Sequence, residues 1–568
     1  MELAKYKRCS QAARGLIKSD LVLRNAKIVN VFTDRVEPGS VAIKDGMIVG
    51  IGDDYEGEEE IDLHGQYLTS GFINAHLHLE STLVNPQNLI AQAARHGTTT
   101  FIVDPHEAAN VCGRAGIDYL MEQTKDSPAH VCFMIASCVP ASPIDDNGVK
   151  LLAEDMLDYM DNERVLGLGE VMSVPEVING DPDMYAKLLL FRGMVKDGHA
   201  PDLSDKDLAA YVLAGINTDH EGTTFEYVMK EKAMGMTCHI REGSAARNLE
   251  MIVKGILENN ASTDGFCFCT DDKHIEDIMH EGEIDHNVRK AVSMGLNPIA
   301  AVKMATIQAA RCYGLRRIGA VAPGFYADLT VWDSLKDFNA QMVFYKGEPI
   351  EKRLKIHRYP VPRELLGTVH LGEIDPGKLY VPADGKPYPV LKMIPGQIVT
   401  ERDDRILPGR DGEFIPEGGL EKIAVFERHH ATGKVGAGAV EGYNLKGGAI
   451  ASSVSHDSHN IIVIGDNDRD ILLAVRELER AGGGYTIVQD GKVYDTLELP
   501  IMGLISDKSY SFVSGKLKKM IAQAHRMGVP RDMDPFITLS FMALTVIPEI
   551  RCTPRGMYSV PEGRFLDR

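Results

Sequence analysis

The stretch Phe72-Ile73-Asn74-Ala75-His76-Leu77-His78-Leu79-Glu80 decides how the rest of the chain is interpreted. Its apolar start is typical of a buried β-strand, and it ends in His-x-His. Side chains of a strand alternate between its two faces, so His76 and His78 point the same way and Leu77 points to the other side. Two imidazoles at one strand end can bind a single divalent metal ion. The stretch therefore predicts a metal-dependent hydrolase.

Length and composition indicate a globular protein with more than one domain. The chain has 568 residues, more than one hydrophobic core usually serves, so two or three domains are expected. Its net charge of −20 disfavours nucleic acid and anionic membranes as partners. Neither a signal peptide nor an apolar run of membrane-spanning length is apparent. Nine cysteines without a Cys-x-x-Cys pair predict reduced thiols and a cytoplasmic location.

Two flanking blocks read as short strands. The first covers residues 21–30, 40–44 and 47–51, with the turn pair Asp45-Gly46 between the last two. The second covers residues 327–332 and 342–345. We expect both blocks to pair into one small sheet domain formed by residues 1–70 and 316–370.

The insert between the flanks, residues 71–315, alternates strand-like runs with helix-like stretches at 88–96, 151–162 and 224–234. Alternation of this kind predicts a parallel sheet, and eight repeats over about 250 residues fit a (β/α)8 barrel. The eight runs end in polar clusters at His76/His78/Glu80, 104–107, Cys138, Glu170, 197–199, 219–221, 239–243 and 270–272. In a barrel, these clusters share the end that carries the chemistry. Cys267 and Cys269 are interpreted as small buried residues of the eighth strand, in preference to a metal pair.

Residues 375–568 are predicted to form a separate α+β domain. Its strands are expected at 422–426, 448–452 and 460–464, followed by a helix over 469–481. Residues 401–419 are rich in charge, Gly and Pro and are expected to be a loop. Gly482-Gly-Gly484 lacks the Lys-Ser/Thr of a phosphate-binding loop, so it is interpreted as a turn.

Six ligand-type residues follow five different predicted strands. Singly, each has a plainer interpretation as a hydrogen-bonded structural group or a helix cap, apart from the His-x-His pair. Together they fit two metals about 3.5–4 Å apart that share Glu170 as a bridge. Imidazoles with carboxylates suit Zn, Fe or Mn better than Ca or Mg. The six candidates are His76, His78, Glu170, His199, His220 and Asp271.

A resemblance narrows this interpretation. Gly71-Phe-Ile-Asn-Ala-His-Leu-His-Leu-Glu80 resembles the first-strand signature of the amidohydrolase superfamily, and the flanking blocks look like its small β-sandwich domain. Within that superfamily the chain is similar to the adenine deaminases over residues 20–565. The segments that carry this likeness lie at 103–110, 168–172, 197–201, 218–221, 240–246, 269–274, 427–433 and 455–462. Two departures stand out: Ser81-Thr-Leu83 replaces Ser-Ser-Met, and Glu170 stands where many relatives have a carboxylated Lys.

The resemblance implies an activity and a division of roles. It implies hydrolytic deamination of adenine to hypoxanthine and ammonia, in purine salvage or catabolism, by hydroxide bridging two metals, with Mn or Fe preferred and Zn as an alternative. Asp271 would take the proton of the bridging water and pass it on. Asp104, His106 and Glu107 would contact the base and move protons, unless they only form a turn and cap a helix. Arg241 and Ser244 would line the pocket, with loop support as the alternative. A homo-oligomer is expected.

The motif Ser455-His-Asp-Ser-His-Asn460 is the hardest to interpret. His456 and His459 are either substrate-binding residues, carried over the pocket by the C-terminal domain of the same or a neighbouring subunit, or part of a polar turn.

Three functions are alternatives to adenine deamination. A related amidohydrolase acting on another aminopurine or a cyclic amide keeps the same metal site. A non-catalytic protein on this fold predicts missing ligands, and none is missing. The cytidine-deaminase class is excluded, because His78-Leu-Glu80 has no accompanying Pro-Cys-x-x-Cys.

Overall fold

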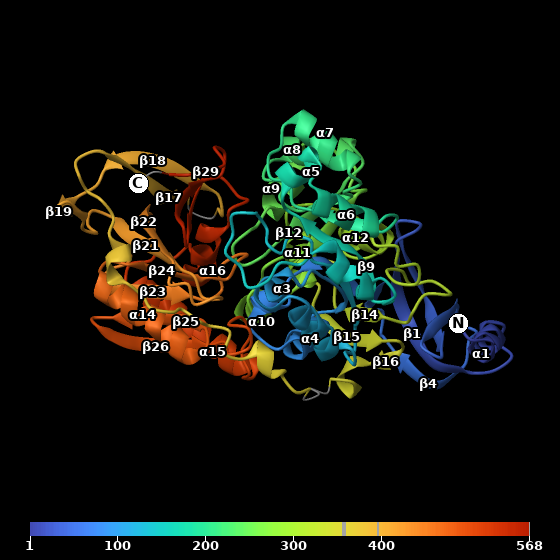
Figure 1. The fold of residues 1–568 in the computed structure, drawn as a ribbon. Coiled ribbons are helices and arrows are strands. Elements are labelled where there is room, and N and C mark those ends of the chain that lie inside the picture. The colour runs from blue at the N-terminus through green and yellow to red at the C-terminus, as the bar shows by residue number, and fades with distance from the viewer. Residues whose placement is uncertain (355–358, 395–396, 567–568) are drawn as a thin grey trace.

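The computed structural model describes residues 1–354, 359–394 and 397–566 (Figure 1). Residues 355–358 of the predicted flanking domain, and 395–396 and 567–568 of the predicted C-terminal domain, lie outside the described residues. Figure 1 shows three bodies side by side, with the N-terminal strands at one end and the C-terminal sheet at the other. Among the described residues, no helix has the length and apolar character needed to cross a membrane.

The first body is an eight-stranded sheet built from both flanks, with α1 (Leu3–Ala13) packed against β3. Strand β14 pairs antiparallel with β5, so that Leu329 faces Ser70 and the two blocks share one sheet. Asp45 and Gly46 both have positive φ, as a tight turn between β2 and β3 requires. The strands are β1 (Ser19–Asn30), β2 (Arg35–Lys44), β3 (Met47–Ile51), β4 (Gly57–Asp62), β5 (Tyr67–Ser70), β14 (Leu329–Trp332), β15 (Ala340–Tyr345) and β16 (Glu348–Pro349).

The middle body contains two parallel sheets. The first has the order β10-β9-β8-β7-β6 and the second has the order β11-β12-β13. Every strand coincides with one of the eight predicted runs, so the predicted mixed α/β fold with parallel strands is confirmed. A parallel bridge from Leu77 to Asp271 joins the end of β6 to the residues that follow β13. The strands are β6 (Phe72–Leu77), β7 (Thr98–Val103), β8 (His130–Ile135), β9 (Val165–Val171), β10 (Val195–Gly198), β11 (Thr218–Asp219), β12 (Thr237–Arg241) and β13 (Phe266–Cys269).

Helices connect these strands. They are α2 (Pro86–Arg95), α3 (His106–Cys112), α4 (Arg114–Thr124), α5 (Val174–Asn179), α6 (Pro182–Leu190), α7 (Asp205–Leu213), α8 (Phe225–Ala233), α9 (Leu249–Glu258), α10 (Ile275–Glu281), α11 (Ile284–Ser293), α12 (Pro298–Met304) and α13 (Ile307–Cys312), with the short 3-10 turn η1 (Glu80–Thr82). The helix predicted over 151–162 is wrong in type, because the chain forms the 3-10 segment η2 (Ala153–Tyr159) there. Its buried side chains, Met156 and Tyr159, are three residues apart, which is the repeat of a 3-10 helix.

The cysteines are all free thiols. Cys267 and Cys269 are buried on the same side of β13, in a small cluster with Ile73 and Ala75 of β6. This position agrees with their interpretation as small core residues, and neither side chain is available to the polar ends of the strands.

The C-terminal body has an eight-stranded sheet of mainly antiparallel strands, and α14 (Asp468–Ala481) packs on it. The sheet contains β17 (Pro387–Met393), β18 (Thr400–Ile406), β21 (Leu420–Phe426), β22 (Val435–Glu441), β23 (Gly448–Ser452), β24 (Ile461–Gly465), β25 (Gly484–Gln489) and β26 (Lys492–Glu498). Further elements of this body are β19 (Gly409–Arg410), β20 (Glu413–Phe414), α15 (Tyr510–Arg526), α16 (Pro535–Ser540), η6 (Phe541–Ala543), β27 (Ile550–Thr553), β28 (Gly556–Ser559), β29 (Arg564–Phe565) and the 3-10 turn η5 (Pro376–Leu379). The 3-10 turns η3 (Ile350–Lys352) and η4 (Arg363–Leu365) follow β16 before this body begins.

The predicted loop over 401–419 is wrong for much of its length. Residues 400–406 form β18, which pairs with β17 at the edge of the sheet, and β19 and β20 form a short hairpin. An edge strand tolerates charged side chains because one side of it faces solvent. Here Arg405 pairs with Glu441 and Lys392 pairs with Glu401, so the charges that suggested a loop stabilise strand contacts instead.

Candidate metal centre

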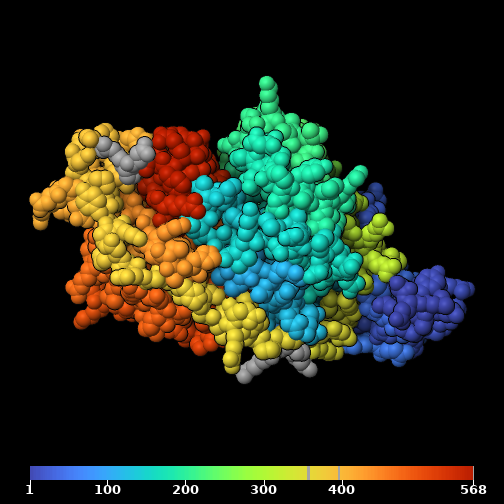
Figure 2. All heavy atoms as spheres, in the orientation of Figure 1, coloured from blue at the N-terminus to red at the C-terminus, as the bar shows by residue number. Residues whose placement is uncertain are grey.

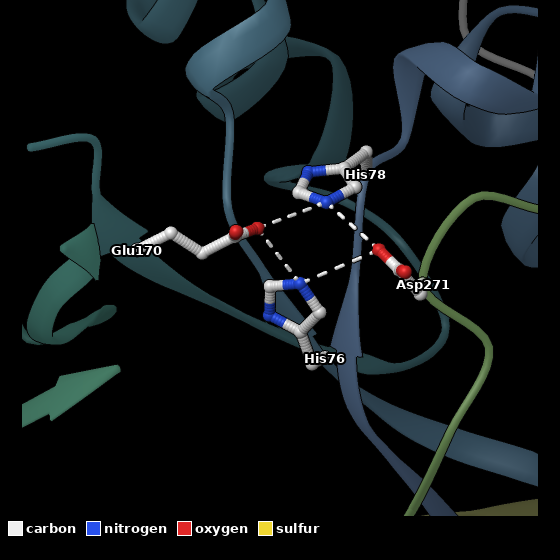
Figure 3. Close-up of side chains that lie close together, drawn as sticks. All are labelled: His76, His78, Glu170 and Asp271. Atoms are coloured by element: carbon white, nitrogen blue, oxygen red, sulfur yellow. Dashed lines mark hydrogen bonds and ion pairs between the residues drawn. The ribbon is translucent and has the colours of Figure 1, made fainter. Parts of the chain in front are cut away.

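One carboxylate, Glu170, lies at the centre of the six predicted ligands. It stands near the end of β9, opposite the His-x-His pair of β6 (Figure 3). Its Oε1 is 3.0 Å from Nε2 of His76 and 3.2 Å from Nε2 of His78. Asp271, just after β13, completes this side, with Oδ1 3.1 Å from Nε2 of His78 and 3.7 Å from Nε2 of His76.

The second oxygen of Glu170 faces the other two histidines. Nδ1 of His199, after β10, is 2.9 Å from Oε2, and Nε2 of His220, after β11, is 3.5 Å from it. The two oxygens of one buried carboxylate therefore serve two different groups of ligand atoms. That division matches a carboxylate placed between two neighbouring cations.

Several buried polar atoms here have no hydrogen-bond partner among the described residues. A buried polar atom without a partner costs free energy, so such atoms call for an explanation. These are the lone-pair atoms with which imidazole and carboxylate bind transition metals. The residues present therefore fit divalent cations. The atoms are Nδ1 and Nε2 of His76, Oε1 of Glu170, Nε2 of His199 and Nε2 of His220.

The pKa values of these groups also favour a site for positive charge. Burial favours the neutral imidazole of His76, but Asp271 and Glu170 outweigh it and raise the pKa of His76 to about 10. Burial opposes the charge of Glu170, yet His220 and the other imidazoles hold its pKa well below the usual range. The ionised carboxylates thus require positive charge beside them. Without a metal, protonated imidazoles supply that charge; a bound metal ion would replace those protons and supply it instead.

Asp104 lies beside His106 and Glu170, with Oδ1 3.4 Å from Nδ1 of His106, but it is not among the residues that line the cavity. It is fully buried, and its carboxylate accepts hydrogen bonds from the backbone N–H of His106 at 3.1 Å and of Glu170 at 2.7 Å. It therefore positions the chain that carries Glu170. His106, in contrast, lines the cavity, with Nε2 3.3 Å from Oε1 of Glu107.

The motif of the C-terminal body reaches this site within the same chain. Nδ1 of His456 is 2.5 Å from Oε1 of Glu107, and Nε2 of His459 contacts the other oxygen of that carboxylate. The ring of His456 stacks on Phe541, with centroids 4.5 Å apart. Glu107 of the middle body is thus held between two histidines of the C-terminal body.

Of the two predicted pocket residues Arg241 and Ser244, only Arg241 lines the cavity. The guanidinium of Arg241 pairs with Glu221 and lies 2.9 Å from Oδ2 of Asp271, so it fixes the position of a candidate ligand. The hydroxyl of Ser244 donates to Asp277 and accepts from the N–H of His274 at 2.9 Å. Ser244 is not among the residues that line the cavity; it lies in the loop between β12 and α9 and is hydrogen-bonded to the start of α10.

The cavity at the metal centre is small, about 20 Å³, which is room for about one water molecule. Its lining includes residues that sequence reasoning did not assign to the site: Met172, Glu221, Asp272, Asp457, Phe541, Leu544 and Ile547. Glu221 and Asp272 stood in the polar clusters that end their strands, and that signal was sufficient to find them. Phe541, Leu544 and Ile547 lie in an apolar segment with no such signal.

We call residues 541–548 the roof segment, because Phe541, Leu544 and Ile547 close the cavity from the C-terminal body. Figure 2 shows the red C-terminal part of the chain packed against the cyan part of the middle body. At this contact the hydroxyl of Thr545 lies 3.0 and 3.1 Å from the two carboxylate oxygens of Asp145. In this closed arrangement the cavity has no room for a ligand larger than about one water molecule.

Asp145 makes stability depend on pH. Burial raises its pKa to about 7, and the nearby Asp457 and Asp146 raise it as well, whereas the hydrogen bond from Thr545 lowers it. Between pH 4 and 7 the folded protein holds a proton that the unfolded chain has lost, so stability falls as pH rises through this window. Asp145→Asn removes this dependence. We expect the thermal midpoint of the variant, relative to wild type, to be higher at pH 8 than at pH 5.5, by the equivalent of about 2 kcal/mol.

The control for this experiment is Asp161→Asn, at an exposed position. Equal changes in midpoint at the two pH values for Asp145→Asn would contradict the assignment.

The parallel strands with histidines and carboxylates at their carboxyl ends define a metal-dependent hydrolase. Comparisons with known proteins agree. A family model described as "Amidohydrolase family" matches residues 67–350, and one described as "Adenine deaminase C-terminal domain" matches residues 397–564.

Full-length relatives extend the match. An adenine deaminase of Desulfitobacterium hafniense is 51% identical over 560 residues, covering 99% of this chain and 98% of the relative. One of Clostridium acetobutylicum is 44% identical, covering 98% and 99%. The chain therefore belongs to the amidohydrolase family, together with these adenine deaminases. Among solved structures, an enamidase has a TM-score of 0.45 at 18% identity, covering 60% of this chain and 97% of that chain.

Proposed function

We propose that this protein hydrolyses adenine to hypoxanthine and ammonia at the centre built around Glu170. Its similarity to adenine deaminases runs over nearly its whole length and includes the C-terminal region that closes the cavity. The observation that carries the proposal is the Glu170 carboxylate, whose two oxygens face two separate groups of histidines in a buried cavity. Deamination of adenine serves purine salvage or catabolism.

We further propose a pair of cations. His76, His78 and Asp271 would hold one with Oε1 of Glu170, and His199 and His220 would hold the other with Oε2. Manganese or iron suits these ligands, with zinc as the alternative. When bound, the cations would supply an activated water for attack on C6 of the base and would neutralise the charge that develops.

The side chains of the protein would then move the protons. Water gives its oxygen to C6, and the C6–N bond breaks; the departing amino group needs one proton more than it carries. Asp271 is proposed to take a proton from water and deliver it to that nitrogen, since Arg241 at 2.9 Å and His78 at 3.1 Å fix its two oxygens. Without this transfer the amino group is a poor leaving group.

The substrate side of the cavity is proposed to include His106, Glu107 and His456. Glu107 links the two histidines, at 3.3 Å from His106 and 2.5 Å from His456, and so offers a proton path from the cavity to the C-terminal body. Asp457, whose pKa burial raises to about 7, can donate a proton to an acceptor nitrogen of a base at neutral pH. Phe541 lies flat against His456 and supplies an apolar face.

The proposed domain organisation follows the sequence. The two parallel sheets would form one (β/α)8 barrel over residues 71–315, since β10 lies against β11 and the Leu77–Asp271 bridge joins the remaining edges. Residues 1–70 and 316–370 would form the small β-sandwich domain, and residues 375–568 the C-terminal α+β domain. A homo-oligomer and a cytoplasmic location stay predictions from the sequence.

Metal removal tests the function directly. The purified protein, stripped with a chelator and reloaded with Mn²⁺, Fe²⁺ or Zn²⁺, is expected to release ammonia from adenine only in the reloaded samples. Activity should return in proportion to metal bound, up to two ions per chain. A panel of other aminopurines and cyclic amides serves as the control for substrate. Stripped protein that retains full activity, or loaded protein that is silent on adenine, would contradict the proposal.

A further inference from the structure

A second pocket lies far from the metal centre along the parallel strands. It has a volume of about 560 Å³ and meets the amino ends of β8 and β9, whereas the metal centre lies at their carboxyl ends. Four parts of the chain form it: the turn between α4 and β8 with the start of β8, residues 163–166 at the start of β9, residues 314–318 after α13, and Tyr326 with Tyr345 and Lys346 of the first body. A volume of this size is in the range of small-molecule sites.

The pocket is basic in an acidic protein. The whole chain has 61 Lys and Arg against 81 Asp and Glu. The lining of this pocket reverses that ratio, with one acidic side chain, Glu163, against five basic ones: Lys125, Arg164, Arg316, Arg317 and Lys346. A concave site lined by one sign of charge concentrates ligands of the opposite sign. Lys125 is already paired with Glu122, so Arg164, Arg316, Arg317 and Lys346 are the charges that remain to attract an anion.

The basic side chains of the pocket differ in the hydrogen bonds and ion pairs that they already form. Arg164 donates to the carbonyls of Val131 and Met121, so it contributes a fixed charge. Arg316 and Arg317 are exposed, and neither side chain has a hydrogen bond or ion pair within residues 1–354, 359–394 and 397–566. Their guanidinium groups are free to form the bidentate bonds that a phosphate accepts.

Two further groups complete a site for a phosphorylated ligand with a flat ring. The hydroxyl of Ser127 is buried in the lining without a partner among the described residues, and can donate to an oxyanion. Nζ of Lys346 lies 5.5 Å from the ring centroid of Tyr326 and 4.9 Å from that of Tyr345. A cation and two aromatic rings thus stand next to the free arginines.

We propose that this pocket binds a nucleoside monophosphate. Arg316, Arg317 and the Ser127 hydroxyl receive the phosphate, and the half-buried ring of Tyr326 receives the base. The volume exceeds what an inorganic phosphate fills, and the tyrosines give no benefit to one. A nucleic acid is disfavoured by the net charge of −20.

The test is a calorimetric titration of the metal-loaded full-length protein with inosine monophosphate, inorganic phosphate and inosine as separate probes. We expect saturable binding of the nucleotide that is tightest of the three. The double variant Arg316→Ala/Arg317→Ala should bind it at least about tenfold more weakly, since two charge-assisted contacts are lost. Arg311→Ala, an exposed arginine outside the pocket, is the matched control and should bind as wild type.

Adenine deaminase activity of the double variant should be unchanged, which shows that it is folded. The proposal is overturned if none of the probes binds or if the double variant binds the nucleotide as wild type does. Inorganic phosphate binding as tightly as the nucleotide would overturn the nucleotide assignment.

Discussion

Glu170→Gln is expected to lower kcat/KM for adenine by at least about 10³-fold and to reduce bound metal below two ions per chain. The change keeps the shape of the side chain and removes its negative charge. Its two oxygens face His76 and His78 on one side and His199 and His220 on the other, so one substitution disturbs both proposed metal positions. A mutation at any single histidine would disturb only one of them.

The measurement combines steady-state ammonia release with metal analysis of the same sample. Glu176→Gln on α5 is the matched control, since it makes the same chemical change six residues away and outside the metal cavity. It should retain wild-type turnover and metal content. Wild-type turnover by Glu170→Gln would remove Glu170 from the site altogether.

Arg551→Met is expected to destabilise the C-terminal body by about 3–5 kcal/mol and to lower activity. Arg551 is fully buried, and burial lowers its pKa to about 9. Its guanidinium donates to the carbonyls of Phe541 at 3.0 Å, Ile547 at 2.7 Å and Pro548 at 2.8 Å. One side chain thus forms hydrogen bonds to both ends of the roof segment, and the variant leaves these carbonyls without their donor.

Measuring bound metal separately from stability and activity distinguishes loss of the roof contacts from damage at the metal centre. All six candidate ligands lie between residues 76 and 271, so Arg551→Met should keep its bound metal while its thermal midpoint and kcat/KM fall. Arg551→Lys, which keeps the charge but fewer donors, should recover part of the loss. The exposed Arg531→Met is the control. Loss of metal in step with activity would contradict a role through the roof segment.

The sequence predicted the strand ends and much of the site because both follow from local patterns. Each apolar run is followed by its polar cluster, and parallel strands place their carboxyl ends together. That is why His76, Glu170, His199 and Asp271 were found without any contact information. Pairing of β14 with β5 was predictable for a similar reason, since two short strand blocks flank one long insert.

Side-chain direction and distant packing were not predictable in this way. A polar residue after a strand either faces the cavity or forms hydrogen bonds to other parts of the chain. Which of the two occurs depends on whether a hydrogen-bond partner from elsewhere in the chain lies within reach. Asp104 binds the N–H of Glu170, a residue of another strand, and Ser244 binds Asp277 of α10, beyond the next helix and strand. Phe541 and Leu544 are ordinary apolar residues in sequence, and only the docking of the C-terminal body brings them to the cavity.

The separation of ligands and roof along the chain has a consequence for how the enzyme is made. During synthesis, residues 76–271 leave the ribosome long before residues 541–548, and domains generally fold as they emerge. Divalent cations would therefore reach the nascent centre from open solvent, and docking of the last domain would then enclose them in a cavity of about 20 Å³. Metal supply in the cell at the time of translation would then determine which ion the finished protein carries, and later exchange would require the closed cavity to open.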